Sequence, residues 1–469
     1  MHLNLSFITQ NFSQVSFLNL PKNLNLAVDI SIDSRTIKPG QFYLALKGEN
    51  FEGHLFINDA LKNGARGIII NENQKKHLEK VNNKFLDEII FLIVEDTHKF
   101  LLDLAHLWRQ SFDIPVVGIT GSVGKTTTKQ MLANILKTSN INSFISFKNQ
   151  NNLIGLPLNI LKLTDEYKVA VFELGISRPG EMEILADILR PTICIITNIS
   201  SAHVSGLGNL KKIAEEKLKI FKFLKNDQIG ILWGDQNLIK KSFNHPVVKF
   251  GFKKSNHIQA RKIKLISTED KKIQVSFEMF FYQQRFQVNL AIGHSGFVNN
   301  ALAAASVAHF LDIDLKTIID SLESYSGFEQ RFEQVELKNK KGFLINDCYN
   351  ACPQSMKAAI QAFDEIKNNG PKIAILGDML ELGKKKLYWH RQIGRLIAKS
   401  KTITNLILVG QCSKVIAQVL PFSIKVEVVN DWHEAKNIYS KLINQKNNLT
   451  LVKASHGIEL YKLVQEFIQ

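Results

Sequence analysis

Short apolar runs alternate with segments of helical periodicity along most of the chain. Apolar strands separated by helices are typical of a parallel sheet that is covered on both faces. The clearest runs of the middle part are Ile89–Val94, Pro115–Ile119, Val169–Glu173 and Ile193–Thr197. The same rhythm returns in the last third at Phe343–Asn346, Ile373–Leu376, Leu406–Val409 and Leu451–Val452. We therefore predict two doubly wound sheets.

Two other parts of the chain differ from this rhythm. Near the start, Phe42–Leu46 precedes a Lys47-Gly48 turn and Gly67–Ile70 follows a helical stretch, which predicts a small α/β domain. Residues 247–289 alternate apolar and polar positions, as antiparallel strands do. We expect an α/β protein of three domains: a small N-terminal domain at 1–87, a central parallel-sheet domain at 88–324 and a C-terminal Rossmann-like domain at 325–469.

The composition is that of an ordinary globular protein. Hydrophobic residues make up 45% of the 469 residues and charged residues 22%. The longest apolar runs are far shorter than the roughly 20 residues that a membrane-spanning helix needs. The N-terminal residues lack the basic and apolar regions of a secretory signal, so we expect a cytoplasmic protein without an integral membrane segment. Its four cysteines are too few for a disulfide framework, and we expect them to be reduced.

The formal net charge of +16 raises nucleic acid as a partner. Most of the 59 basic residues are lysines scattered along the chain. The densest runs, at 338–341 and 384–386, have no interleaved aromatic residues of the kind that stack on single strands. We therefore expect no nucleic-acid partner. A non-catalytic nucleotide-binding or nucleic-acid-binding protein remains the alternative from another class, and salt-dependent retention of nucleic acid without ADP release would favour it.

The strongest motif is a strand, a glycine-bearing turn and a helix-compatible segment between Pro115 and Thr128. Such a turn lets backbone N–H groups converge on phosphate oxygens at a helix N-terminus. Lys125 would reach the β- and γ-phosphates and the Thr126 hydroxyl would bind Mg²⁺. The strict motif has a glycine where this chain has Ile119, so Gly121 must supply the turn. We expect ATP to be bound by Thr120, Gly121, Ser122, Val123, Gly124, Lys125, Thr126 and Thr127.

Two further candidates follow strands of the same predicted sheet. Glu173 ends one apolar strand, and His203 lies shortly after the next. The C-terminal ends of parallel strands form the ligand crevice, so both side chains would face the phosphates and could bind Mg²⁺. A solvated glutamate and a structural histidine are the simpler alternatives for these two residues.

At this point the motifs form a recognisable set. Residues 120–126, Asn151–Pro157, Glu173–Gly175 and 198–203 resemble the central domain of the ATP-dependent Mur ligases. Residues 33–35, 39–40, 45–48 and 53–54 resemble the domain of that family that binds uridine nucleotides. Residues 346–356, the 376–383 segment and His390 resemble the branch that uses D-alanyl-D-alanine. The resemblance covers nearly the whole chain.

The resemblance implies a role for each matching residue. Thr126 and Glu173 would hold one Mg²⁺ and His203 a second. Lys217 falls where the family has a carbamylated lysine. In the family's ATP site, Asn300 would contact adenine, Arg331 the phosphates and Asp347 the nucleotide. The implied catalytic residues are Lys125, Glu173, His203, Lys217 and Arg331. The implied substrate-binding residues are Ser34, Arg35, Lys47, Asn151, Asn152, Tyr349 and Asn350.

The implied reaction is the joining of D-alanyl-D-alanine to UDP-N-acetylmuramoyl-tripeptide. ATP would convert the tripeptide carboxylate into an acyl phosphate, and the dipeptide amine would then attack it, with release of ADP and phosphate. The resemblance also implies a monomeric enzyme that closes its domains around the site. A sibling ligase that adds a diamino acid is one alternative, although its usual Asp-Asn-Pro-Arg motif is absent. A folyl-polyglutamate synthase-like ligase is another, disfavoured by the Tyr349-Asn350-Ala351 block and by the presence of the N-terminal domain.

Overall fold

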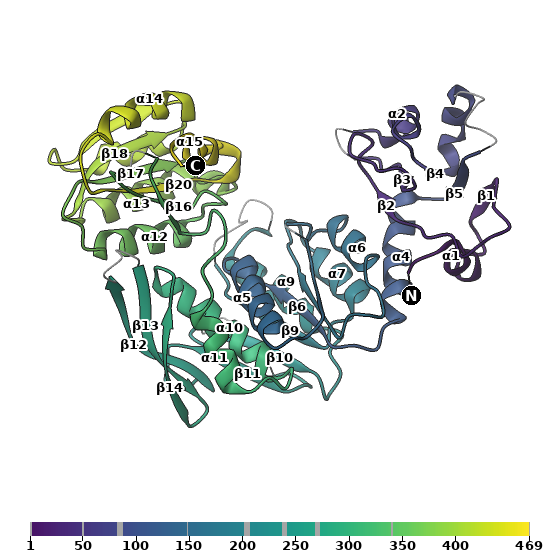
Figure 1. Ribbon diagram of the computed structural model, residues 1–469, viewed down its shortest axis with the longest axis horizontal. Helices are drawn as coiled ribbons and strands as arrows, with labels where there is room; N and C mark the ends of the chain where they lie inside the picture. The colour runs from purple at the N-terminus through teal and green to yellow at the C-terminus, as the bar shows by residue number, and fades with distance from the viewer. Residues whose placement is uncertain are drawn as a thin grey trace. The chain divides into compact units, whose positions relative to one another are not determined.

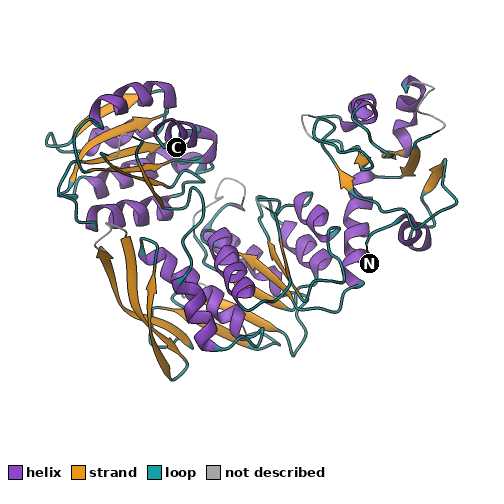
Figure 2. Cartoon of the chain, in the orientation of Figure 1, coloured by secondary structure: helices purple, strands orange, loops and turns teal. Residues whose placement is uncertain are grey.

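The computed structural model describes residues 2–48, 51–81, 88–147, 149–200, 207–236, 242–267, 273–338 and 341–468. The chain divides into two compact units. Unit 1 comprises residues 1–118, 142–176 and 181–191, and unit 2 comprises residues 119–141, 177–180 and 192–469. Both units combine helices with sheets that are mainly parallel (Figure 2), which confirms the predicted α/β class. The three domain boundaries predicted from the sequence remain a prediction.

Unit 1 begins with a five-stranded sheet in the order β1-β5-β4-β3-β2 (Figure 1). Its strands are β1 (Ser16–Leu18), β2 (Ile30–Ser31), β3 (Phe42–Leu44), β4 (Gly67–Asn71) and β5 (Ile90–Val94). Strands β2 to β5 are parallel, and β1 pairs with β5 in the antiparallel direction. Gly67 must be glycine because a Cβ there would lie 2.2 Å from the Phe42 ring. Strand β5 belongs to this sheet, so the sequence-based placement of Ile89–Val94 among the strands of the central domain is wrong.

The helices of unit 1 follow from local capping and apolar periodicity. They are α1 (Leu5–Asn11), α2 (Ile57–Lys62), α4 (Thr97–Gln110), α6 (Gly155–Ile160) and α7 (Glu181–Leu189), with 3₁₀ turns at Gly53–Phe56 and Glu72–Lys80. In α4, the Asp96 side chain accepts the Lys99 N–H as an N-cap, and Trp108 is buried. The unit also contains the parallel strands β7 (Ser143–Ile145) and β8 (Val169–Glu173).

Strand β6 (Val116–Thr120) leads from unit 1 into unit 2, where it is followed by α5 (Lys125–Thr138). Unit 2 then contains a run of strands in the order β14-β13-β12-β11-β10-β9. They are β9 (Ile193–Ile196), β10 (Ile229–Trp233), β11 (Val247–Gly251), β12 (Ile258–Ser267), β13 (Ile273–Phe281) and β14 (Gln284–Leu290). Strands β12 to β14 are antiparallel, as the alternating pattern predicts. The prediction is wrong for β11, which is parallel to both of its neighbours.

Helices of unit 2 accompany this sheet. They are α9 (Leu210–Leu218), the 3₁₀ turn Lys219–Phe221, α10 (Ser295–His309) and α11 (Leu315–Glu323). Helix α10 is buried along most of its length and packs against α5. Its many alanines have small side chains, which let neighbouring elements approach it closely. This packing places the start of α10 beside the start of the helix that follows β6.

The last third forms a six-stranded sheet in the order β15-β16-β20-β17-β18-β19. The strands are β15 (Glu333–Glu336), β16 (Gly342–Asn346), β17 (Lys372–Gly377), β18 (Ile403–Val409), β19 (Lys425–Val429) and β20 (Asn448–Lys453). The helices are α12 (Pro353–Glu365), α13 (Lys386–Ile397), α14 (Trp432–Leu442) and α15 (Leu460–Phe467), with 3₁₀ turns at Gly383–Lys385, Ser413–Val419 and His456–Ile458. Only β15 is antiparallel to its neighbour, so the second doubly wound sheet is confirmed. In the part of the chain that the structure describes, every helix is too short or too polar to cross a bilayer.

Candidate active site

The turn between β6 and α5 has the geometry of a phosphate-binding loop. Both of its glycines are required by close approaches. A Cβ at Gly121 would lie 1.9 Å from the Thr197 hydroxyl oxygen, and one at Gly124 would lie 2.2 Å from the Asn300 Oδ1. Gly124 also has a φ of +88°, in the left-handed region that favours glycine. The loop leads directly into the N-terminus of the 14-residue helix α5, where the helix dipole favours an anion.

The curvature of this loop depends on Asn198, which follows strand β9. The Asn198 carbonyl accepts the Ser122 N–H at 3.0 Å, and its side-chain Oδ1 accepts the Val123 N–H at 2.9 Å. The Ser122 hydroxyl donates to the Ser200 carbonyl at 3.1 Å and lies 2.9 Å from the Ser200 N–H, whose hydrogen it accepts. Two loop amides that the sequence assigns to phosphate are thus bonded to protein in this conformation. Lys125 donates from its Nζ to the Gly121 carbonyl at 3.0 Å.

Lys217 lies on α9 in the same unit and is almost completely buried, with 1% of its surface exposed. Burial, reinforced by the Lys125 ammonium, lowers the pKa of Lys217 well below its ordinary range, and the Glu216 carboxylate opposes that change. An amine in this environment spends more of its time neutral than a surface lysine does. It is therefore a better nucleophile at neutral pH.

Arg331 connects the phosphate-binding loop with the last third of the chain. Its guanidinium donates to the Thr126 hydroxyl at 3.3 Å, across 205 positions of sequence. Its Cζ lies 3.8 Å from the centroid of the Tyr349 ring, so the cation stacks on the aromatic face. Its Nε is buried and has no hydrogen-bond partner among the described residues. The structure thus places a cation, with one N–H still to be satisfied, beside the start of α5.

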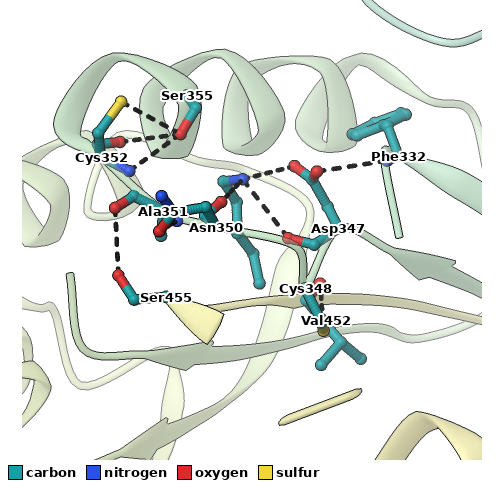
Figure 3. A network of polar contacts seen from close by, with 10 residues as sticks. Phe332, Asp347, Cys348, Asn350, Ala351, Cys352, Ser355, Val452 and Ser455 are labelled. Carbon is teal, nitrogen blue, oxygen red and sulfur yellow. Dashed lines mark hydrogen bonds and ion pairs between the residues drawn. The ribbon is translucent and has the colours of Figure 1, made fainter. Parts of the chain in front are cut away.

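Asn300 and Asp347 are both buried in the same unit. Asn300 lies on α10, and the Thr128 hydroxyl is 3.5 Å from its Oδ1. Asp347 follows β16, and its carboxylate accepts the Phe332 N–H at 3.3 Å and a proton of the Lys453 ammonium at 2.7 Å. Figure 3 shows the surroundings of this carboxylate, with Phe332 on one side and the 350–355 segment on the other.

Comparisons with known proteins agree with this geometry. Family models match in three successive segments: the Mur ligase family catalytic domain at residues 28–109, the Mur ligase middle domain at 119–308 and the Mur ligase glutamate ligase domain at 330–456. A UDP-N-acetylmuramoyl-tripeptide--D-alanyl-D-alanine ligase from Buchnera aphidicola is 33% identical over 94% of this chain and 92% of its own length. The chain belongs to the Mur ligase family. The Bacillus subtilis ligase of the same name is 32% identical over 94% of this chain and 93% of its own length.

Solved structures of Mur ligases have the same fold. MurF from Acinetobacter baumannii superimposes with a TM-score of 0.86 at 27% identity, covering 99% of this chain and 98% of its own. MurF from Thermotoga maritima in complex with ADP gives a TM-score of 0.79 at 27% identity, covering 94% and 97%. These matches cover nearly the whole chain.

Some of the other predicted residues of this Mur ligase lie in unit 1. Glu173 is buried at the end of β8, where the Asn151 side-chain amide donates to its Oε1 at 2.9 Å. Asn152 is exposed, and its Oδ1 accepts the N–H groups of Ile154 at 3.1 Å and Gly155 at 2.8 Å. Asn152 therefore initiates α6 in the manner of a helix cap, and its role in substrate binding stays a prediction.

The residues predicted to bind the nucleotide-linked substrate follow neighbouring strands of the five-stranded sheet. Ser34 and Arg35 come after β2 and Lys47 after β3, and these two strands are parallel, so all three residues follow the same edge. The Arg35 side chain is 83% exposed and forms an ion pair with Asp33 at 2.8 Å. Ser34 is buried, and its carbonyl accepts the Asn63 side-chain N–H.

His203 lies outside the described residues. Three residues to which the sequence assigned no role of their own are part of the site's framework: Asn198, His294 and Lys453. A signal existed for Asn198, because it follows a strand of the predicted sheet beside the loop. Lys453 also ends a strand, but only the fold reveals that this strand adjoins the one before Asp347. His294 carries no sequence signal, because its role as the N-cap of α10 appears only in the fold.

Proposed function

We propose that this Mur ligase joins D-alanyl-D-alanine to UDP-N-acetylmuramoyl-tripeptide with the conversion of ATP to ADP and phosphate. The proposal rests chiefly on relatives named for this reaction, two of which are 33% and 32% identical over 94% of the chain. The phosphate-binding loop and Arg331 supply the matching chemistry, since a buried Nε without a partner among the described residues is suited to an anionic ligand.

The reaction has two steps. An oxygen of the tripeptide carboxylate attacks the γ-phosphorus of ATP, ADP leaves, and an acyl phosphate forms. The dipeptide amine then attacks the acyl carbon, phosphate leaves with the bridging oxygen, and the amine loses a proton as the amide forms. The first step brings two anions together, so most of its catalysis is positioning and charge neutralisation. We assign these tasks to the backbone of residues 121–127, to Lys125 and to Arg331.

We assign the other nucleotide contacts to Asn300 and Asp347. The predicted substrate contacts are those of Ser34, Arg35, Lys47, Asn151, Asn152, Tyr349 and Asn350. We propose that the enzyme is a monomer. We also propose a cytoplasmic location, because the reaction consumes ATP.

Magnesium remains part of the proposal. The Thr126 hydroxyl and the Glu173 carboxylate are buried oxygen donors, which is the donor type that Mg²⁺ prefers. When bound, the ion would neutralise charge on the phosphates. The assignment of a second ion to His203 stays a prediction, because that residue lies outside the described part of the chain.

We propose that Lys217 is carbamylated. Its neutral amine would attack carbon dioxide, form an N–C bond and lose a proton, which converts the neutral amine into an anionic carbamate. The lowered pKa of Lys217 supports this step, because burial favours the reactive neutral amine. The neighbouring Lys125 would stabilise the resulting anion.

The test is a measurement of phosphate release with ATP, UDP-N-acetylmuramoyl-tripeptide and D-alanyl-D-alanine, in which each is omitted in turn. The proposal predicts that phosphate is released only when all three substrates are present. It also predicts that mass spectrometry detects the UDP-linked pentapeptide as the product. Activity with a free amino acid but not with the dipeptide would instead assign the chain to another branch of the family.

A further inference from the structure

The backbone on both sides of Arg331 is strained. Gln330 has a φ of +59° and Phe332 a φ of +53°, and neither is glycine. For a non-glycine residue, the left-handed conformation is populated on the order of tenfold less, or lower still, than the ordinary backbone conformations. It therefore persists only where the surrounding structure enforces it. Two such residues, one on each side, determine the direction in which the Arg331 side chain leaves the chain.

Hydrogen bonds to the segment after β16 hold this strained linker. The Tyr349 N–H donates to the Gln330 carbonyl at 3.2 Å, and the Phe332 N–H donates to the Asp347 Oδ1 at 3.3 Å. Figure 3 shows the Phe332 nitrogen directed at the Asp347 carboxylate. The same segment carries the Tyr349 ring on which Arg331 stacks. The position of the Asp347 carboxylate therefore affects both the linker and the arginine.

Lys453 fixes that carboxylate from the neighbouring strand. Its Nζ donates to the Asp347 Oδ2 at 2.7 Å and to the Asn350 carbonyl at 3.1 Å, and it lies 3.5 Å from the Asp347 carbonyl. Side-chain exposure is 2% for Lys453 and 10% for Asp347. A buried ion pair of this kind is weak evidence for a gain in stability, but removing one partner leaves the other charge uncompensated. The Lys453 ammonium is therefore suited to holding the Asp347 carboxylate in one position.

We propose that Lys453 is a positioning residue that holds the strained 330–332 linker through Asp347 and so directs Arg331 at the phosphate-binding loop. The effect on catalysis rests on the function proposed above for Arg331, whereas the effect on the linker does not. Lys453 acts without touching the reacting atoms. The loss of its ammonium releases the Asp347 carboxylate, and the linker then relaxes toward ordinary backbone angles.

The experiment compares the full-length protein with Lys453→Met, Gln330→Gly and the double variant. Hydrogen–deuterium exchange of the peptide spanning residues 328–334 reports on the linker without any substrate. We expect Lys453→Met to exchange at least tenfold faster there. Its kcat for the three-substrate reaction falls about a hundredfold. Glycine accepts the left-handed conformation freely. Relative to Lys453→Met, we therefore expect the double variant to exchange about tenfold more slowly in this peptide and to have a kcat about tenfold higher.

Lys372→Met is the matched control. Lys372 is also a buried lysine of the last third, and its Nζ donates to the Phe363 and Asp364 carbonyls and to the Thr402 hydroxyl, far from the linker in sequence. We expect this variant to lower stability without faster exchange at residues 328–334. Equal exchange of the linker in Lys453→Met and the parent protein overturns the proposal, as does a double variant with no recovery. A parent protein without ligase activity refutes the proposed function alone, because the exchange measurement still decides the role of Lys453.

Discussion

We expect the replacement of His294 by asparagine to remove an acid-sensitive contribution to stability. His294 is the N-cap of α10, and its Nδ1 accepts the Gly296 N–H at 3.0 Å. Its ring packs edge-on against Phe297 and Phe332, with centroid distances of 4.6 and 5.0 Å. A protonated imidazole has no acceptor for the capping hydrogen bond, so the folded state requires the neutral form.

The magnitude follows from the pKa of this group. Burial lowers the pKa of His294 from 6.5 to about 4, with a smaller opposing effect of Asp347 and a smaller lowering effect of Lys453. Above pH 6.5 both the folded and the unfolded chain are neutral here, and the residue contributes no pH dependence. Between pH 6.5 and 4 only the unfolded chain binds the proton, so stability falls as the pH falls. The loss is about 2 kcal/mol at pH 5 and approaches about 3 kcal/mol below pH 4.

The assay is urea unfolding of the parent protein and of His294→Asn at several pH values from 7.5 to 5. Asparagine is a good N-cap and does not titrate, so the variant retains the capping acceptor without the proton. It loses ring packing, which shifts its stability equally at every pH. The difference between the two proteins is therefore expected to change by about 2 kcal/mol over this range in favour of the variant. Parallel pH curves for the two proteins would show that protonation of His294 does not destabilise the folded state.

Three other substitutions test the site. Gly124→Ala forces a Cβ toward the Asn300 Oδ1, and we expect the KM for ATP to rise more than tenfold. The control is Gly40→Ala, because Gly40 has a similar φ of +90° and a Cβ there would have no atom within 4 Å. We expect this control to leave the KM for ATP unchanged. Arg331→Lys keeps the charge but loses the planar stacking, and kcat is expected to fall about a hundredfold. Lys217→Ala is expected to be inactive and to regain activity with added short carboxylates; intact activity without such rescue would remove Lys217 from the site.

The phosphate-binding loop could be predicted from the sequence because its geometry is local. A strand, two glycines and a helix start occupy a few consecutive residues, and each follows from backbone preferences. The same local reasoning could not reveal that the amides of Ser122 and Val123 are bonded to Asn198, 75 positions later in the case of Val123. Contacts of that kind depend on which strands become neighbours, and the order of strands is not written in any one segment.

The roles of Arg331 and Asp347 were available only through the family resemblance. Arg331 lies 205 positions from Thr126, and Lys453 lies 106 positions from Asp347. No periodicity links such pairs. The alternating pattern of β11 was misleading for a related reason: alternation reports that one face of a strand is buried, and it does not determine whether the neighbouring strands run in the same direction.

The most direct test of the proposed reaction follows one oxygen atom. The tripeptide substrate would be labelled with ¹⁸O in the carboxylate that becomes the amide, and the released phosphate would be examined by mass spectrometry. An acyl-phosphate mechanism transfers one labelled oxygen to phosphate in each turnover. Unlabelled phosphate, formed at the same rate as the pentapeptide, would contradict the account.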